Sequence, residues 1–170
     1  DDGVEMEIQV NPEFNIDLAT NEAEKYSIVV GQMPYTLRKA LTDVSIHAGK
    51  APFSGDMGNI VIHTNQGEEY ISQGILAETL IHETVHAVLD SDHKRAPGWA
   101  NAQQQDLGFI STYAKDHPFR EDLAESFVPY MAVRYKSARI SLELEQTITA
   151  TMQHRINYFE DLAIEIYPME

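Results

Sequence analysis

The sequence predicts an α+β fold: a small mixed sheet followed by a mostly helical C-terminal half. Two-residue alternation of apolar and polar side chains is confined to the region before residue 64, and helical periodicity dominates after residue 72. With 170 residues, 43% of them apolar, the chain is expected to form a single domain over residues 1–170. Its longest apolar run, Tyr130–Val133, is too short to insert in a membrane.

Charge and cysteine content exclude several classes of function. Twelve basic residues stand against 27 acidic residues, a formal net charge of −15, which disfavours nucleic acid and anionic membrane surfaces as partners. The chain contains no cysteine, so disulfide frameworks, cysteine-ligated metal sites and thiol nucleophiles are excluded. It begins Asp1-Asp2-Gly3 without an initiator methionine, and we expect a mature or trimmed form.

Strands are expected mainly in the first third of the chain. The elements predicted there are, in order, a strand over Val4–Val10, a helix from about Thr20 to Gly31, a helix from Pro34 to Leu41, a strand over Asp43–His47, a loop over Ala51–Gly58, and a strand over Asn59–His63 closed by a turn at Asn65–Gly67. The strand Asn59–His63 is the expected sheet edge, with Ile60 and Ile62 facing the core.

The remainder of the chain is expected to be helical. Its predicted elements are a helix over 73–90 capped by Ser72, a polar loop over 91–98, and helices over Trp99–Lys115, Phe119–Lys136 and 140–166. Trp99 is expected to be a core anchor, and Glu68–Tyr70 a solvated turn.

The segment His82-Glu83-Thr84-Val85-His86 matches the pattern H-E-x-x-H. Residues four apart lie on one face of a helix, so both imidazoles can reach one metal ion. Glu83 is offset around the helix, where it can face a water bound to the metal. A zinc ion lowers the pKa of that water, and a carboxylate can then take its proton during attack on a carbonyl.

The helix that carries this motif is predicted to lie inside the fold. Its two adjacent, largely apolar stripes comprise Ile75, Thr79, His82, His86 and Leu89, and Leu76, Leu80, Glu83, Ala87 and Asp90. Burying three ionisable groups there is costly unless they are paired, and a metal ion pairs with all three.

A catalytic zinc site needs a third protein ligand, and two candidates exist. His93 lies eleven residues after His82, whereas the pattern H-E-x-x-H-x-x-G-x-x-H places its third histidine ten after the first. Glu121 and Glu125 lie four apart on a predicted helix, so one can bind the metal and the other can accept the outer N–H of a ligand histidine.

H-E-x-x-H followed by a helical E-x-x-x-E resembles the gluzincin metallopeptidases. The finer similarity is to the lethal-factor-like zinc peptidases, which include bacterial Pro-Pro endopeptidases: these carry Tyr-Ala shortly before E-x-x-A-E, as Tyr113-Ala114 precedes Glu121–Glu125 here. The resemblance extends over roughly residues 30 to 135 and includes the order of helix, two strands and zinc helix.

The resemblance implies a Zn²⁺-dependent metalloendopeptidase with a zincin-like fold. It implies His82, His86 and Glu121 as ligands, Glu83 as general base and Glu125 as support for a ligand. Tyr113 would donate a hydrogen bond to the developing oxyanion, although it stands eight residues before Glu121 where the family has seven.

A peptide or protein substrate would add to the exposed sheet edge through backbone hydrogen bonds. The resemblance also implies a bacterial protein that is secreted or located in the cell envelope; oligomeric state is left open. Two alternatives remain: a zinc hydrolase with His93 as third ligand, and a zinc-binding or partner-binding domain of the same fold without peptidase activity.

Overall fold

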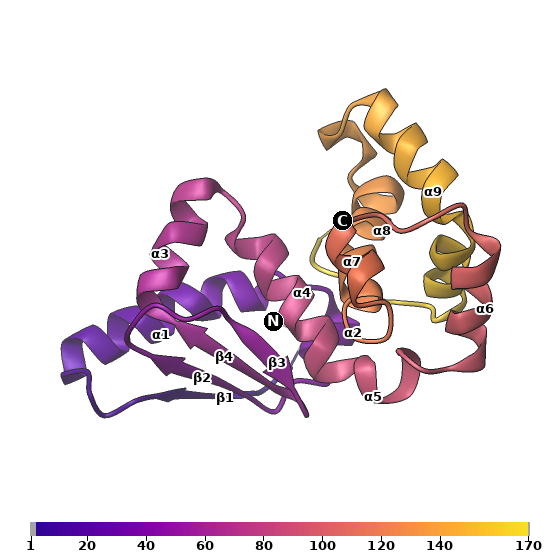
Figure 1. The fold of residues 1–170 in the computed structure, drawn as a ribbon. Coiled ribbons are helices and arrows are strands. Elements are labelled where there is room, and N and C mark those ends of the chain that lie inside the picture. The colour runs from indigo at the N-terminus through magenta and orange to yellow at the C-terminus, as the bar shows by residue number, and fades with distance from the viewer. Residues whose placement is uncertain (1–2, 170) are drawn as a thin grey trace. The chain divides into compact units, whose positions relative to one another are not determined.

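The computed structural model describes residues 3–169 as two compact units. The first unit comprises the chain up to Val88 together with Glu165–Met169, and the second comprises Leu89–Ile164. The predicted α+β class is confirmed: a small mixed sheet of four strands lies near the N-terminus and the C-terminal half is mostly helical (Figure 1). That the two units make up one domain stays a prediction.

The sheet of the first unit has the strand order β1-β2-β4-β3. Its strands are β1 (Glu7–Val10), β2 (Asp43–His47), β3 (Ser54–Asp56) and β4 (Asn59–His63). The strands β1, β2 and β4 run parallel, and β3 pairs antiparallel with β4. Alternate residues of β2 and β4 are buried, so one face of the sheet supplies Val44, Ile46, Ile60 and Ile62 to the core, as predicted for β4.

The prediction that Asn59–His63 is the edge of the sheet is wrong. This strand lies between β2 and β3. The two edge strands are β1 and β3, and β3 lies within the segment expected to be a loop. Met57 and Gly58 have φ angles of 47° and 81° and form a two-residue turn between β3 and β4. Positive φ at both central residues is the geometry that matches the twist of a tight hairpin, so a fourth strand forms where the sequence shows no alternation.

Four helices complete the first unit: α1 (Ile16–Gly31), α2 (Tyr35–Arg38), α3 (Thr64–Gln73) and α4 (Leu76–Val88). The helix α1 begins before the expected Thr20 because the Asn15 side chain accepts a hydrogen bond of 3.0 Å from Leu18 N–H and caps it. The helix α1 packs against β1, and α4 packs against β3 and β4.

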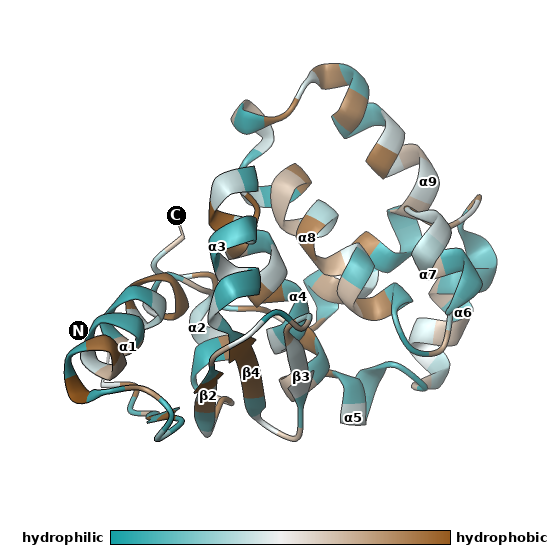
Figure 2. Ribbon diagram, turned by 60° about the vertical axis from the view of Figure 1, so that its left-hand side comes forward, coloured by the Kyte–Doolittle hydropathy of each residue, from teal (hydrophilic) through white to brown (hydrophobic). Residues whose placement is uncertain are grey.

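The expected turn at residues 65–67 is wrong, because these residues lie within α3, as do Glu68–Tyr70. The helix expected over 73–90 is present as α4, but Ser72 does not cap it: Ser72 lies in α3 and donates to the Glu69 carbonyl at 2.8 Å. Gly74, whose φ is 73°, ends α3. A left-handed glycine after a helix is a common C-terminal cap. In Figure 2, α3 is largely hydrophilic, whereas β2 and β4 are largely hydrophobic.

The second unit consists of α5 (Asp90–His93), α6 (Pro97–Gln105), α7 (Thr112–Asp116), α8 (Asp122–Tyr135), the 3₁₀ helix η1 (Ser137–Arg139) and α9 (Leu142–Asp161). The expected loop over 91–98 therefore includes a short helix, and the expected helix over Trp99–Lys115 is two helices joined by residues 106–111. Trp99 is 1% exposed and its ring lies 5.2 Å from that of Phe159, which confirms its predicted place in the core.

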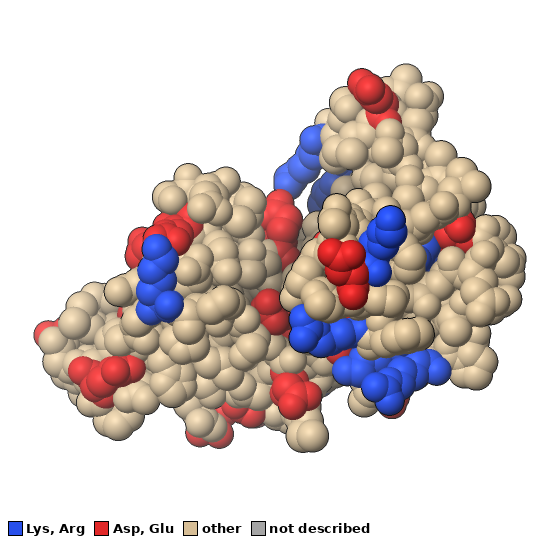
Figure 3. Space-filling model, in the orientation of Figure 1, with Lys and Arg blue, Asp and Glu red and all other residues tan. Residues whose placement is uncertain are grey.

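Charges of both signs intermix on the surface. On the face shown in Figure 3, Asp and Glu side chains occur in several separate groups with Lys and Arg between them. In the first unit Lys25 pairs with Glu22 at 2.8 Å, and in the second Arg134 pairs with Glu160 at 2.5 Å. None of the helices within residues 3–169 has the length and apolar character needed to cross a membrane.

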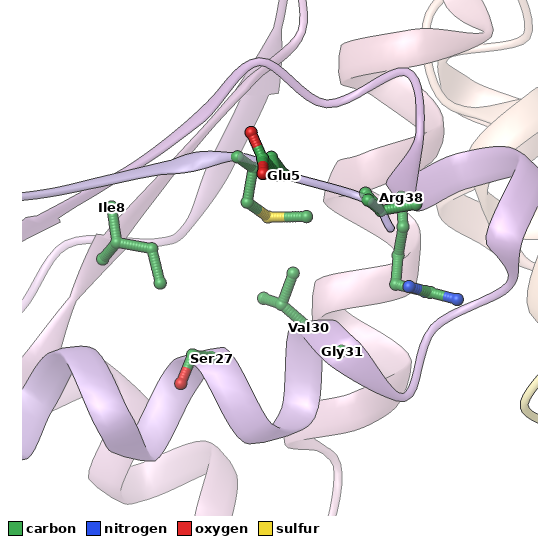
Figure 4. A pocket seen from close by; sticks show the side chains of 8 residues that line it. Glu5, Ile8, Ser27, Val30, Gly31 and Arg38 are labelled. Carbon is green, nitrogen blue, oxygen red and sulfur yellow. The ribbon is translucent and has the colours of Figure 1, made fainter. Parts of the chain in front are cut away.

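A cavity of about 520 Å³ lies in the first unit between α1 and the chain leading into β1 (Figure 4). Ile8 and Val30 border it from the two sides. The Arg38 side chain at its rim is buried and donates to the carbonyl oxygens of Met33 at 2.7 Å and Tyr167 at 3.3 Å. Its guanidinium therefore ties the C-terminal segment to the first unit.

Tyr26 in α1 yields a stability prediction. Its side chain is fully buried, its hydroxyl has no hydrogen-bond partner among the described residues, and burial raises its pKa to about 12. Tyr26→Phe removes this unsatisfied group and should raise the free energy of unfolding by about 1 kcal/mol. The measurement is urea denaturation at neutral pH.

The same variant should change the response to alkali. The pKa of Tyr26 is 10.0 in the unfolded chain and about 12 in the folded protein, so the folded protein holds this proton more tightly. The stability that this difference contributes is fully present below pH 10 and is lost as the pH rises to about 12. Tyr26→Phe should lose less stability over that range than the parent, and Tyr167→Phe, at an exposed position, should lose the same amount as the parent. Equal losses in all three proteins would contradict the account.

Candidate metal centre

The helix α4 presents two imidazoles on one face. His82 and His86 lie one turn apart, and their Nε2 atoms are 3.2 Å from each other. The rings are 4.8 Å apart between centroids and inclined at 78°, so they face one point with their nitrogens rather than stacking. Both side chains are half-buried. Two imidazole nitrogens converging in this way suit a transition-metal ion, for which neutral imidazole is the commonest ligand.

The core holds α4 in place through its other side chains. Leu80 and Val85 are fully buried, and Ile81 is 5% exposed. Thr84, also buried, donates its hydroxyl to the Leu80 carbonyl at 2.6 Å, which removes the cost of an unpaired hydroxyl in the interior. Of the two stripes predicted for this helix, the one with Leu76, Leu80 and Ala87 is buried, whereas Ile75 of the other is 39% exposed. The buried positions Ile81, Thr84 and Val85 lie in neither predicted stripe.

Gly55 allows the edge strand to approach the backbone of α4 directly. A Cβ atom at Gly55 would overlap the Glu83 carbonyl, and the Gly58 N–H donates to the Ala87 carbonyl at 2.8 Å. The strand β3 therefore fixes the backbone at Glu83 and at the end of α4. Sequence analysis missed Gly55, and its only signal is a glycine inside a short polar segment.

Tyr70 of α3 is a second residue that sequence analysis missed. Burial, and to a smaller degree the negative charge of Glu83, raise the pKa of Tyr70. Its ring packs edge-on against Phe53 at 5.0 Å. Tyr70 is therefore half-buried in α3 against Phe53, whereas the sequence indicated a solvated turn there.

Glu121 belongs to the second unit and is 6% exposed. Its Oε1 accepts hydrogen bonds from the Tyr113 hydroxyl at 3.1 Å and from Arg120 Nε at 2.6 Å. The residue directly precedes α8 instead of lying within a helix as expected, because a turn in which Glu121 N–H donates to the His117 carbonyl at 2.8 Å leads into α8.

Tyr113 on α7 is brought to the Glu121 carboxylate within the second unit. Its hydroxyl also accepts a bond of 3.1 Å from Arg120 Nη2, and its ring lies 5.0 Å from that of His117. The intervening turn at residues 117–121 therefore accommodates the separation of eight residues, and the side chain stays 45% exposed. The predicted hydrogen bond from Tyr113 to a substrate oxyanion stays a prediction, since the hydroxyl donates to Glu121 in this structure.

Glu125 lies one turn into α8 and accepts a hydrogen bond of 2.5 Å from the Ser111 hydroxyl. Ser111 is also the N-cap of α7, where it accepts from the Ala114 N–H at 3.0 Å. The hydroxyl thereby joins the helix that carries Tyr113 to the one that follows Glu121. The predicted contact of Glu125 with a ligand histidine stays a prediction.

Among residues 3–169, His82, His86 and Glu121 form a group that could hold a metal ion. His93, the alternative third ligand, is not in this group, and its Nδ1 lies 2.8 Å from the Tyr158 hydroxyl.

Comparison of the chain with protein-family models, curated proteins and solved structures found no match.

Because β3 approaches α4 closely, alanine should destabilise the protein at Gly55 but not at Gly31. Gly55→Ala must separate the strand from the helix and should lower the free energy of unfolding by about 1–3 kcal/mol, the usual range for overpacking. Gly31→Ala is the matched control, since a Cβ there meets nothing within 4 Å and alanine favours the helix. Urea denaturation of both variants checks this; a Gly55→Ala protein as stable as Gly31→Ala would refute the close contact.

Proposed function

We propose that this protein is a zinc-dependent metallopeptidase of the gluzincin type with a zincin-like fold. The observation that carries the proposal is the pair of Nε2 atoms 3.2 Å apart on α4, with Glu83 between the two histidines in the sequence. Two imidazoles and one carboxylate are the ligand set of a catalytic zinc that keeps an open position. The lethal-factor-like peptidases that the motifs resemble support the same assignment.

In this proposal His82, His86 and Glu121 hold the zinc ion. The bound ion would act as a Lewis acid that polarises the substrate carbonyl and lowers the pKa of bound water. Glu83 accepts the proton of the attacking water and delivers it to the leaving amine. Because water is the nucleophile, no covalent intermediate with the protein forms. The Tyr113 hydroxyl donates to the oxyanion that develops on the substrate, a contribution worth about 10²–10³ in rate. Glu125 supports the ligands.

The substrate in this proposal is an extended segment of a peptide or protein. It pairs with the free edge of β3, which takes the place that the sequence assigned to Asn59–His63. This edge packs beside α4, the helix that bears Glu83. From the resemblance we also propose a bacterial location outside the cytoplasm, secreted or in the cell envelope.

Metal retention should depend on the α4 histidines. His86→Ala removes one of three ligands and should reduce bound zinc from about one ion per chain to a small fraction of that, since a two-ligand site competes poorly with buffer. His154→Ala, an exposed histidine of the second unit, is the control and should retain the full amount. Elemental analysis after dialysis measures this, and equal zinc in the two variants would exclude the proposed ligands.

Glu83→Gln should separate binding from catalysis. The amide keeps the shape of the side chain but cannot accept a proton, so bound zinc should be unchanged and cleavage of a peptide library should fall at least about 10²-fold. Glu78→Gln, an exposed glutamate on the same helix, should cleave like the parent.

Full zinc-dependent activity in Glu83→Gln would eliminate the mechanism. A parent protein with full zinc and no cleavage of any library peptide would instead support the alternative, a partner-binding domain.

A further inference from the structure

We propose that Asp122, held by Arg155 and Gln103 within a buried charge cluster of the second unit, positions Glu121 to bind the metal. The third member of the cluster, Asp106, secures α9. The inference rests on the proposed function, because it assigns a purpose to the cluster only if Glu121 is a ligand. It gives a positioning role to Asp122, Arg155 and Gln103, which the motif and the resemblance leave without one.

Arg155 on α9 bridges the two carboxylates. Its Nε donates to Asp122 Oδ2 at 2.8 Å, and its Nη1 donates to Asp106 Oδ2 at 2.9 Å and to the Gly108 carbonyl at 2.9 Å. The side chains are buried, with exposures of 0% for Arg155, 0% for Asp122 and 1% for Asp106. The guanidinium also lies over the Phe109 ring, 4.9 Å from its centroid.

A cluster of this kind is a poor way to stabilise a fold. Three charges are removed from water, and the two carboxylates share one guanidinium. Asp122 Oδ1 and Arg155 Nη2 are both buried without a hydrogen-bond partner among the described residues. Well-packed apolar side chains would serve stability at least as well, since desolvation of buried ions offsets most of their attraction. The cluster is therefore better explained by how it fixes the backbone around it than by a contribution to the stability of the fold.

The cluster fixes the backbone around Glu121. Asp122 follows Glu121 directly and is the first residue of α8. Gln103 on α6 donates from one Nε2 to Asp122 Oδ2 at 2.8 Å and to the Pro118 carbonyl at 2.9 Å. The segment from Pro118 to Asp122 is thus tied to α6 through Gln103 and to α9 through Arg155. A side chain between two such ties has few positions available to it.

Asp106 offers a matched control within the same cluster. It shares Arg155 and nearly complete burial, but its carboxylate also accepts from the backbone N–H groups of His154 at 2.7 Å and Arg155 at 3.1 Å. These bonds secure α9 close to its non-helical residue Met152. Loss of Asp106 should therefore disturb α9, whereas loss of Asp122 should also release Glu121.

The test measures zinc affinity and thermal stability in three variants of the full chain. Asp122→Asn and Asp106→Asn should both lower Tm, because each leaves Arg155 with one carboxylate fewer. Competition with a chelator should show zinc binding about 10–100-fold weaker in Asp122→Asn and close to the parent in Asp106→Asn. The visible absorption of bound Co²⁺ should change in Asp122→Asn alone. Should Asp122→Asn fail to fold, Gln103→Ala removes the other tie without leaving a charge and should weaken zinc binding in the same sense.

Glu121→Gln distinguishes the two levels of the proposal. If it weakens zinc binding while Asp122→Asn and Gln103→Ala bind zinc as the parent does, the positioning device is refuted and the ligand assignment stands. Equal weakening in Asp106→Asn and Asp122→Asn would also refute the device, because general loss of stability would then explain both. If Glu121→Gln binds zinc like the parent, the ligand assignment is wrong and the positioning proposal falls with it.

Discussion

The half-buried face of α4 is the constraint on which the rest of this structure depends. His82, Glu83 and His86 are half-buried on α4. Ionisable groups removed from water are stable only when they are paired. The two Nε2 atoms, 3.2 Å apart, can be satisfied together by one cation. In the second unit Glu121 shows the same condition, a carboxylate that is 6% exposed and already hydrogen-bonded to Tyr113 and Arg120. In each unit the proposed ligand atoms are thus held in place by their surroundings.

Preorganisation is built differently in the two units. In the first it comes from backbone packing, because Gly55 lets an edge strand lie against the α4 backbone at Glu83. In the second it comes from side chains, because Ser111 joins α7 to Glu125 and the cluster around Arg155 ties the segment that bears Glu121. Both arrangements lower stability locally, because one replaces a side chain with glycine and the other buries charges. Functional sites commonly carry such costs for the sake of fixed geometry.

The sequence predicted what depends on regular spacing. The α+β class, the strands Asp43–His47 and Asn59–His63 and the core position of Trp99 were predicted and are present in the structure. Of the two stripes predicted on the zinc helix, the one that contains Leu76, Leu80 and Ala87 is buried, whereas Ile75 of the other is 39% exposed. The edge strand β3 could not be predicted, because Ser54-Gly55-Asp56 has no apolar alternation and owes its conformation to the turn at Met57–Gly58 and to contact with α4. The pairing of Asp122 with Arg155 was equally hidden, since residues far apart in the chain carry no spacing signal. The end of α3 at Gly74 was visible in principle, because glycine is the usual left-handed cap.

The central claim is that one zinc ion is bound by two histidines and a glutamate. X-ray absorption spectroscopy at the zinc edge of the loaded protein tests this most directly, because imidazole ligands are counted from their multiple scattering. The account predicts two imidazole nitrogens at about 2.0–2.1 Å with oxygen ligands completing the shell. In the Glu121→Ala protein, any zinc that remains bound should show the same two imidazoles and one oxygen ligand fewer or exchanged for water. A spectrum with three imidazoles would place His93 or another histidine on the metal and would contradict the assignment of Glu121.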